Sequence, residues 1–272
     1  MNIGMYSAAS GMLAQWTALD IASNNLANVN TTGFKKDEVL FKAFPERLMS
    51  RFYDNVVKIP LGSIDKSPIV GKMGTGVEVN EVITRFEKRD GETIIPFKKT
   101  DNKFDLALDG EGFFTIATDK GERYTRAGAF TINQDGILVD MNGFPVLGEK
   151  GIINVGYADF KVDEFGNVAI KQDLSMEWEV IDKLKLVDFY DKRGIVKEGK
   201  NYYYWTKEAG EIKEPENLKV LQGFLEGSNV NPVIEMTKLI EIQRAYEACQ
   251  KAVQSEDQLL GRAVNDILNM RG

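Results

Sequence analysis

The sequence predicts an α+β protein, in which N- and C-terminal helices pair as a coiled-coil domain and flank a β-rich middle domain. Apolar residues repeat at every seventh position near both ends of the chain. Between these ends, β-branched and aromatic runs alternate with Asp-Gly and Asn-Gly turns, the pattern of short strands. Each helical stripe needs a partner to cover it, so the economical arrangement is that the two stripes pair with each other.

The first helix is expected within residues 1–34, where helix-forming residues dominate from Ala8 to Ala27. Its apolar stripe consists of Met5, Met12, Leu19 and Leu26, interleaved with Ala9, Trp16 and Ser23. The other positions carry small or neutral polar groups and almost no charge. In water such a helix would expose an apolar patch, so we expect other copies or partners to bury it. Burial inside its own β domain is the alternative.

The last helix is expected within residues 225–272, with Asn231 as its cap and Pro232 in the first helical position. Its stripe runs through Leu239, Ile242, Tyr246, Cys249, Val253, Glu256, Leu260 and Ile267. Glu256 is the polar exception. We expect it to meet Ser23, Asn24 or Asn28 near the end of the first helix, or a cation of another copy, because a single polar residue in such a stripe can set the register.

Two regions lie between the helices. Residues 35–76 are rich in Gly and Pro and predict a mixed connector, with a possible short helix around Pro45 to Tyr53. Residues 77–224 predict the β-rich domain. Its expected strands are Phe113–Ala117, Ala129–Ile132, Ile137–Val139, Lys185–Tyr190 and Asn201–Thr206.

Composition excludes several classes of function. The chain has no histidine and a single cysteine, Cys249, which removes imidazole catalysis, His-ligated zinc and an intrachain disulfide. With 34 Lys and Arg against 41 Asp and Glu, its net charge is −7, unsuited to nucleic acid. No apolar stretch is long enough to span a bilayer, and the N-terminus lacks the features of a cleaved signal peptide. We expect no metal and no cofactor.

One enzymatic alternative remains open. Asp105, Asp109 and Glu111 could supply the paired carboxylates of a secreted cell-wall hydrolase, although acids beside a Gly-rich turn are far more often solvated turn residues. The Gly-rich stretch 71–76 matches neither a phosphate-binding loop nor a dinucleotide fingerprint. Cys249 lies on an apolar stripe, where packing is its expected role.

Several blocks of the sequence resemble the bacterial flagellar rod and hook proteins. The blocks follow the order of that family and reach nearly from end to end. They are Ala9–Met12, Ser23–Lys35, Phe104–Leu108, Gly110–Phe114, Tyr124–Gly128, Pro145–Gly148, Leu225–Pro232 and Gln243–Glu247. The rod subgroup of FlgF and FlgG type is the most similar. The blocks Phe41–Pro45 and Leu225–Val230 favour the FlgF-like proximal rod, since the FlgG-like distal rod tends to carry Thr where Gly227 stands.

The resemblance implies a structural subunit without catalytic residues, cofactor, small-molecule substrate or nucleic-acid partner. It implies that the subunit is exported by the flagellar type III apparatus without a cleaved signal. It then assembles with itself and neighbouring rod proteins into the periplasmic rod of the basal body, which transmits motor torque around the export channel. The residues expected at the assembly interface are Met5, Met12, Trp16, Leu19, Asn24, Asn25, Leu26, Asn28, Leu239, Ile242, Tyr246, Val253, Glu256, Leu260 and Ile267.

Overall fold

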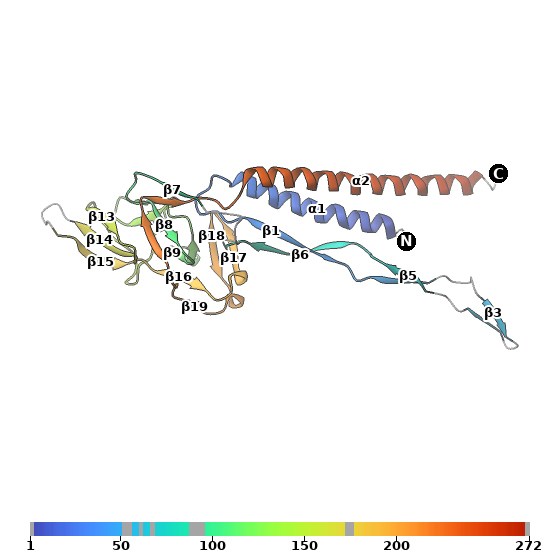
Figure 1. Cartoon of the computed structure of the whole chain (residues 1–272), viewed down its shortest axis with the longest axis horizontal. Helices are drawn as coiled ribbons and strands as arrows, with labels where there is room; N and C mark the ends of the chain where they lie inside the picture. The colour runs from blue at the N-terminus through green and yellow to red at the C-terminus, as the bar shows by residue number, and fades with distance from the viewer. Residues whose placement is uncertain are drawn as a thin grey trace. The chain divides into compact units, whose positions relative to one another are not determined.

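The computed structural model describes residues 3–50, 56–59, 62–65, 69–86, 96–171 and 177–269. The chain forms two compact units, each assembled from separate stretches of sequence (Figure 1). Unit 1 comprises residues 1–24, 37–83 and 233–272, and unit 2 comprises residues 25–36 and 84–232. The chain therefore passes from one unit to the other four times.

Unit 1 contains the two terminal helices and a series of two-stranded ribbons. Helix α1 spans Ile3–Ala27 and helix α2 spans Pro232–Asn269, which confirms both terminal helices. The ribbons pair β1 (Asp37–Ala43) with β6 (Val77–Thr84), β2 (Arg47–Ser50) with β5 (Ile69–Met73), and β3 (Val56–Ile59) with β4 (Gly62–Asp65). Helix α1 lies between α2 and the β1–β6 ribbon (Figure 1).

The ribbons correct the interpretation of residues 35–76. The short helix expected around Pro45 to Tyr53 is wrong for Arg47–Ser50, which forms β2, while residues 51–53 lie outside the described residues. Strand β2 pairs with β5, about twenty positions away, and such non-local pairing overrides weak local propensity. The pairing of β1 with β6 likewise links the expected connector to a strand assigned to the middle domain.

Unit 2 is built around a six-stranded sheet in the order β17-β18-β10-β9-β16-β19. The remaining strands form the three-stranded sheet β13-β14-β15 and the pairs β11-β12, β20-β8 and β21-β7. The bounds are β7 Phe97–Lys99, β8 Leu106–Asp109, β9 Phe113–Thr118, β10 Gly121–Thr125, β11 Phe130–Ile132, β12 Leu138–Asp140, β13 Asp159–Val162, β14 Asn167–Lys171, β15 Glu179–Lys183, β16 Leu186–Phe189, β17 Ile195–Gly199, β18 Tyr202–Trp205, β19 Ile212–Lys213, β20 Lys219–Gln222 and β21 Phe224–Glu226, with 3₁₀ turns at Lys192–Gly194 and Lys207–Ala209. These bounds confirm all five strands named from the sequence.

The six-stranded sheet separates two apolar clusters. Successive residues of β9 point to opposite faces, so Phe114 packs against Phe130 at a ring-centroid distance of 5.1 Å while Phe113 packs against Phe189 at 5.6 Å. The first cluster also holds Leu106, Leu138 and Val168, and the second holds Tyr203. Both faces of the sheet are thus buried, which accounts for the near-continuous apolar run Phe113–Ala117.

Gly128 provides a sharp test of this packing. A Cβ atom at this position would lie 1.6 Å from the carbonyl oxygen of Leu106, because the Leu106 N–H donates to the Gly128 carbonyl at 2.9 Å. We expect Gly128→Ala to lower the free energy of unfolding by more than about 3 kcal/mol, whereas Thr131→Ala, at the exposed position of β11, should cost about 1 kcal/mol or less. Denaturant unfolding of the purified variants checks this, and near-equal stabilities would contradict the close approach.

Candidate assembly faces and the network that anchors them

Small residues of α1 form its contact with α2. Ala18 and Ala22 are buried together with Ile242 of α2, and Leu19 and Leu239 pack against this cluster. Further along, a Cβ atom at Gly11 would lie 3.1 Å from the Cys249 Sγ atom, and one at Gly4 would lie 2.8 Å from the Glu256 carboxylate. The two helices therefore run antiparallel, with residues of α1 that carry little or no side chain facing α2.

This contact shifts the expected stripe of α1 by one position. The residues that face α2 include Gly4, Gly11 and Ala18, each one position before the predicted stripe. Met5, Met12, Leu19 and Leu26 are half-buried beside it, while the interleaved Ala9, Trp16 and Ser23 are exposed. Two helix backbones can approach closely only where the side chains between them are small, so Gly and Ala occupy the contact. The predicted stripe instead runs through the largest apolar residues.

On α2 the described residues of the expected stripe from Leu239 to Glu256 are buried or half-buried. Ile242 is buried, and Leu239, Tyr246, Cys249, Val253 and Glu256 are half-buried. The Tyr246 ring lies 6.3 Å from the Trp16 ring, measured between centroids. Leu260 is exposed, because α2 is 38 residues long and α1 only 25, so α2 continues past the start of its antiparallel partner. The side chain of Ile267 lies outside the described residues.

The expected partners of Glu256 within the chain are wrong. Ser23, Asn24 and Asn28 belong to the end of α1, whereas Glu256 lies over Gly4 at its beginning. The antiparallel direction of the helices is the reason. At this position the carboxylate lies beside the first turn of α1, where free N–H groups and the helix dipole favour negative charge.

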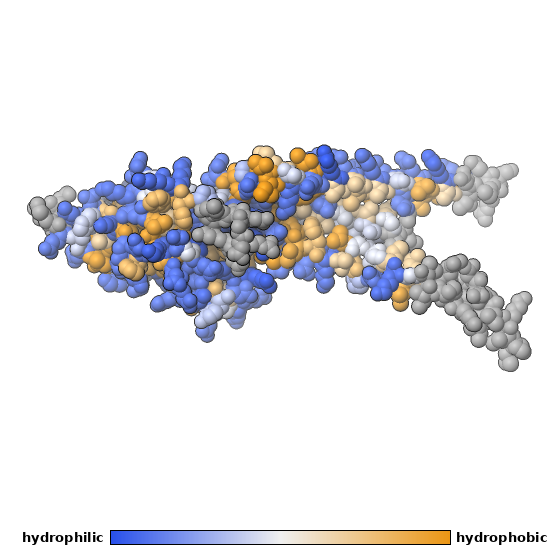
Figure 2. Space-filling view, viewed as in Figure 1, coloured by the Kyte–Doolittle hydropathy of each residue, from blue (hydrophilic) through white to orange (hydrophobic). Residues whose placement is uncertain are grey.

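The helices of unit 1 leave large apolar side chains in solvent. On α1, Tyr6, Leu13 and Trp16 follow one another at helical spacing and are 63%, 71% and 57% exposed. We call these three residues the α1 outer face. Figure 2 shows apolar side chains gathered over the first turns of α2, where Val233, Ile234, Met236 and Ile240 are exposed. Exposed apolar groups clustered in this way are typical of surfaces that another molecule covers.

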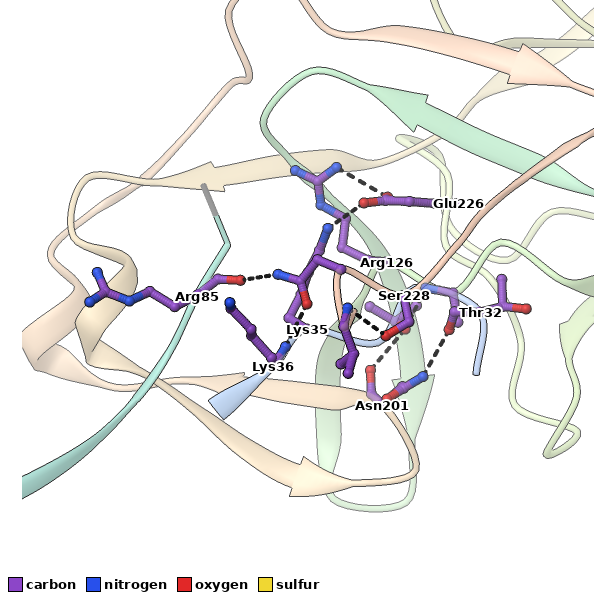
Figure 3. A network of polar contacts seen from close by, with 12 residues as sticks. Thr32, Lys35, Lys36, Arg85, Arg126, Asn201, Glu226 and Ser228 are labelled. Atoms are coloured by element: carbon purple, nitrogen blue, oxygen red, sulfur yellow. Dashed lines mark hydrogen bonds and ion pairs between the residues drawn. The ribbon is translucent and has the colours of Figure 1, made fainter. Parts of the chain in front are cut away.

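Unit 2 contains a buried polar network that we call the clasp: Lys35, Arg126, Glu226 and Asn229, of which Figure 3 labels the first three. The Lys35 ammonium group donates to Glu226 Oε1, and Arg126 Nη1 lies 3.4 Å from Glu226 Oε2. The side chains of Lys35 and Glu226 are 1% exposed and that of Arg126 is 5% exposed. Burial of such charges is tolerated only when they are paired, and here two cations share one carboxylate.

Asn229 extends the clasp to the backbone. Its side-chain oxygen accepts from the Lys36 N–H at 2.7 Å, and its amide donates to the Arg85 carbonyl at 2.8 Å. The Arg85 N–H in turn donates to the Lys36 carbonyl at 2.9 Å. Three segments of unit 2 are thereby joined, and these segments continue along the chain into α1 and β1, into β6, and into α2.

Gly33 lets the chain pass close to Arg126. Its φ angle is +67°, and a Cβ atom there would lie 2.5 Å from the Ala127 nitrogen. Its N–H donates to the Glu226 carbonyl at 2.8 Å, and nearby the Asn201 amide donates to the Thr32 carbonyl at 2.8 Å. A glycine at this position avoids both the backbone strain and the collision.

The sequence named none of the clasp residues as a site. Among the predicted asparagines, Asn25 is buried, Asn28 accepts a hydrogen bond from the Thr31 hydroxyl at 3.1 Å, and Asn24 is exposed. The clasp residues do lie inside the blocks that carried the family resemblance. The presence of charged residues within these otherwise apolar or Gly-rich blocks could have pointed to them. The pairing of Lys35 with Glu226, 191 positions away, could not be predicted from the sequence.

The acids considered for hydrolysis have structural roles. Asp105 is buried and accepts from the Asn102 amide at 3.0 Å, while Glu111 pairs with Lys192 at 2.6 Å. Asp109 lies in β8 opposite Lys219 of β20. Within the described residues, no group of three or more Cys, Asp or Glu side chains could hold a metal ion, and no helix is long and apolar enough to cross a membrane.

Helices that expose apolar faces, in a chain that also has a β-rich unit, are typical of the class of assembly subunits. Comparison with known proteins then identifies the family. Residues 5–35 match the flagella basal body rod protein family, residues 107–170 the flagellar hook protein FlgE/F/G D1 domain, and residues 221–266 the flagellar basal body rod FlgEFG protein C-terminal region.

Full-length relatives agree. The chain is 35% identical to the flagellar basal-body rod protein FlgF of Caulobacter vibrioides, over 97% of each chain. It is 33% identical to FlgG of the same organism, over 93% of this chain and 95% of the relative, and 33% identical to FlgG of Borreliella burgdorferi, over 97% and 98%. The chain belongs to the FlgF/FlgG-type family of flagellar basal-body rod proteins.

The contact between the helices can be tested with one substitution. The Cys249 Sγ atom lies 3.1 Å from the Cβ position of Gly11, which is within disulfide reach. We expect Gly11→Cys to form an intrachain disulfide with Cys249 under mild oxidation, detected by mass spectrometry of the non-reduced peptides. Ala9→Cys, on the exposed side of α1, is the matched control. Equal crosslinking from both positions would contradict the antiparallel contact described here.

The clasp predicts that removing the charge of the buried Glu226 lowers stability far more than removing the charge of an exposed carboxylate. Glu226→Gln leaves Lys35 and Arg126 buried without a counter-charge and should lower the free energy of unfolding by about 3 kcal/mol or more. Glu164→Gln removes an exposed pair with Lys219 and should change it by only ~0.5 kcal/mol. Denaturant unfolding monitored in both variants gives the comparison. If the two substitutions cost the same, the clasp does not stabilise unit 2.

Proposed function

We propose that the chain is a structural subunit of the bacterial flagellar basal-body rod, not an enzyme. It assembles with copies of itself and with neighbouring rod proteins into the shaft that transmits motor torque and surrounds the export channel. The observation that carries this proposal is the α1 outer face, whose large side chains stay exposed although α2 and the β1–β6 ribbon already contact the same helix. Membership of the rod-protein family supports it.

In this proposal the terminal helices form an inner coiled-coil domain in the assembled rod. The antiparallel contact of α1 with α2 and the seven-residue repeat of α2 support it. Among the expected interface residues, Leu19, Leu239, Ile242 and Tyr246 contribute to packing between the helices. Trp16, Asn24 and Leu260 are exposed, so neighbouring copies can reach them.

The subunit would leave the cytoplasm through the flagellar type III export apparatus and take its place in the periplasmic part of the basal body. Its single cysteine is compatible with passage as an extended chain, because no intrachain crosslink can form. This step rests on family membership.

Between the two rod types, the FlgF-like proximal subunit is favoured over the FlgG-like distal one. The Caulobacter FlgF and FlgG proteins are 35% and 33% identical to the chain, a small difference in the same direction. Gly227 supports it further. A Cβ atom at this position would lie 2.9 Å from both the carbonyl oxygen and the Cγ atom of Pro96, so Thr would not fit without rearrangement.

Substitutions on the α1 outer face test the proposed function. Tyr6→Glu combined with Leu13→Glu places two charges on exposed positions of α1, so the subunit should fold normally but fail to enter the basal body. In a strain lacking the wild-type gene, we expect normal cellular levels of the variant, absence from purified basal bodies and loss of swimming. Met141→Glu, at a side chain 76% exposed in unit 2, is the control. Normal incorporation of the double variant would contradict the proposal.

A further inference from the structure

The three-stranded sheet of unit 2 has one face that no other described element covers. Phe160, Val162 and Val168 point to the apolar core, so the alternate residues point outward. The register places Lys161 opposite Ala169 and Ala169 opposite Val180 on that outward face. Val180 is 60% exposed, and Trp178, which precedes β15, is 46% exposed. Large apolar side chains on a solvent-facing sheet are a mark of a binding surface.

Two lysines, Lys161 and Lys171, lie on this outward face, whereas Glu179, exposed beside Trp178, lies opposite the core-packed Ile170 on the other face of the sheet. The Lys161 ammonium group lies 5.9 Å from the centroid of the Trp178 ring, and Lys171 lies on the adjoining strand β14. Neither lysine forms an ion pair with another residue in the described part of the chain. Asp159 is paired with Lys103 at 2.6 Å, and this hydrogen bond lowers the pKa of the Asp159 carboxyl, so that pair is neutral overall. We call Lys161, Lys171, Trp178 and Val180 the Trp178 face.

A hollow beside Trp178 adds shape to the surface. It has a volume of about 390 Å³ and is also lined by Thr100, Asn102 and Gln222. The lining also contains the acidic Asp101 and the basic Lys103. The hollow has room for side chains of a partner.

The same unit carries a segment of complementary charge. Residues 208–216, which we call the acidic segment, include Glu208, Glu211, Glu214 and Glu216, all exposed, and the half-exposed Ile212. Its lysine, Lys213, is already engaged with the buried Asp188 at 3.3 Å. Within one copy, no described residue of this segment forms an ion pair with the Trp178 face. The pKa of Lys183, the last residue of β15, is raised by its hydrogen bond with Glu149 and by the charge of Glu214, so one acid of the segment lies near the end of that strand.

We propose that, in the assembled rod, the Trp178 face of one copy binds the acidic segment of the next copy. The inference rests on the proposed function, because a shaft built by repeating one subunit requires heterologous contacts, in which two different patches of the same chain meet. Opposite charges on the two patches select the register and exclude face-to-face contacts between identical patches. Trp178 and Ile212 supply the apolar area that the charges surround.

A charge exchange tests the pairing. Lys161→Glu with Lys171→Glu reverses the charge of the Trp178 face. Glu211→Lys with Glu214→Lys reverses the charge at two positions of the acidic segment. All four positions lie at the surface of unit 2, so the purified variants should unfold like wild type. We expect each pair alone to reduce incorporation into basal bodies by about fivefold or more, and the combination of all four to restore it, because the attraction is regained with its sign exchanged. Lys98→Glu with Lys99→Glu, at exposed positions of β7, is the control and should have no effect.

The outcomes separate this inference from the proposed function. Loss in both pairs with recovery in the combination supports the contact, as would a disulfide between copies carrying Trp178→Cys and Glu211→Cys in a Cys249→Ser background. Normal incorporation of either pair overturns it, and so does loss without recovery, which would mean that the face binds another rod protein. None of these results bears on the proposed function, because that proposal is tested separately by the variants of the α1 outer face.

Discussion

Burial of the Glu226 carboxylate between Lys35 and Arg126 is the interaction on which the rest of the structure depends. The chain passes between its two units four times, and residues next to three of these passages meet around this one carboxylate and Asn229. A buried charge without partners would be strongly unfavourable, so the segments leading to α1, β1, β6 and α2 are held to a single arrangement inside unit 2. Gly33 allows the approach, since any side chain there would collide with the backbone at Arg126 and Ala127.

The second constraint is the contact between two long helices made by residues with almost no side chain. Gly4, Gly11, Ala18 and Ala22 bring α2 close to α1, and the large side chains of α1 are therefore directed to its flanks and its outer face. A helix with apolar groups distributed around most of its circumference suits a position surrounded by neighbours. The same residues that pack the subunit thus leave Tyr6, Leu13 and Trp16 for assembly, as the proposed function requires.

The two units carry different kinds of surface. On α1, unit 1 exposes an apolar helix face with little charge, suited to close packing from which water is excluded. Unit 2 has two buried clusters of its own, and its exposed surface combines charge with single aromatic side chains. Contacts that combine charge with single aromatic side chains, as on unit 2, specify the register between partners more than they add affinity. A rod subunit needs both, because cohesion along the shaft and a fixed angular step between copies are separate requirements.

The sequence by itself determined the two helices, the β-rich middle, the five strands named in advance and the family. Each of these depends on local pattern: periodicity along a helix, alternation along a strand, turn residues at fixed spacing and motif order. Only the tertiary structure decided the ribbon at Arg47–Ser50, the one-position shift of the α1 contact, the position of Glu256 over Gly4 and the clasp. The strand at Arg47–Ser50 forms because it pairs with β5. The shift of the contact on α1 follows from how closely the two helix backbones approach. The position of Glu256 follows from the antiparallel direction of α2. The clasp joins residues 191 positions apart, and no local propensity encodes which distant charges will neutralise each other once both are buried.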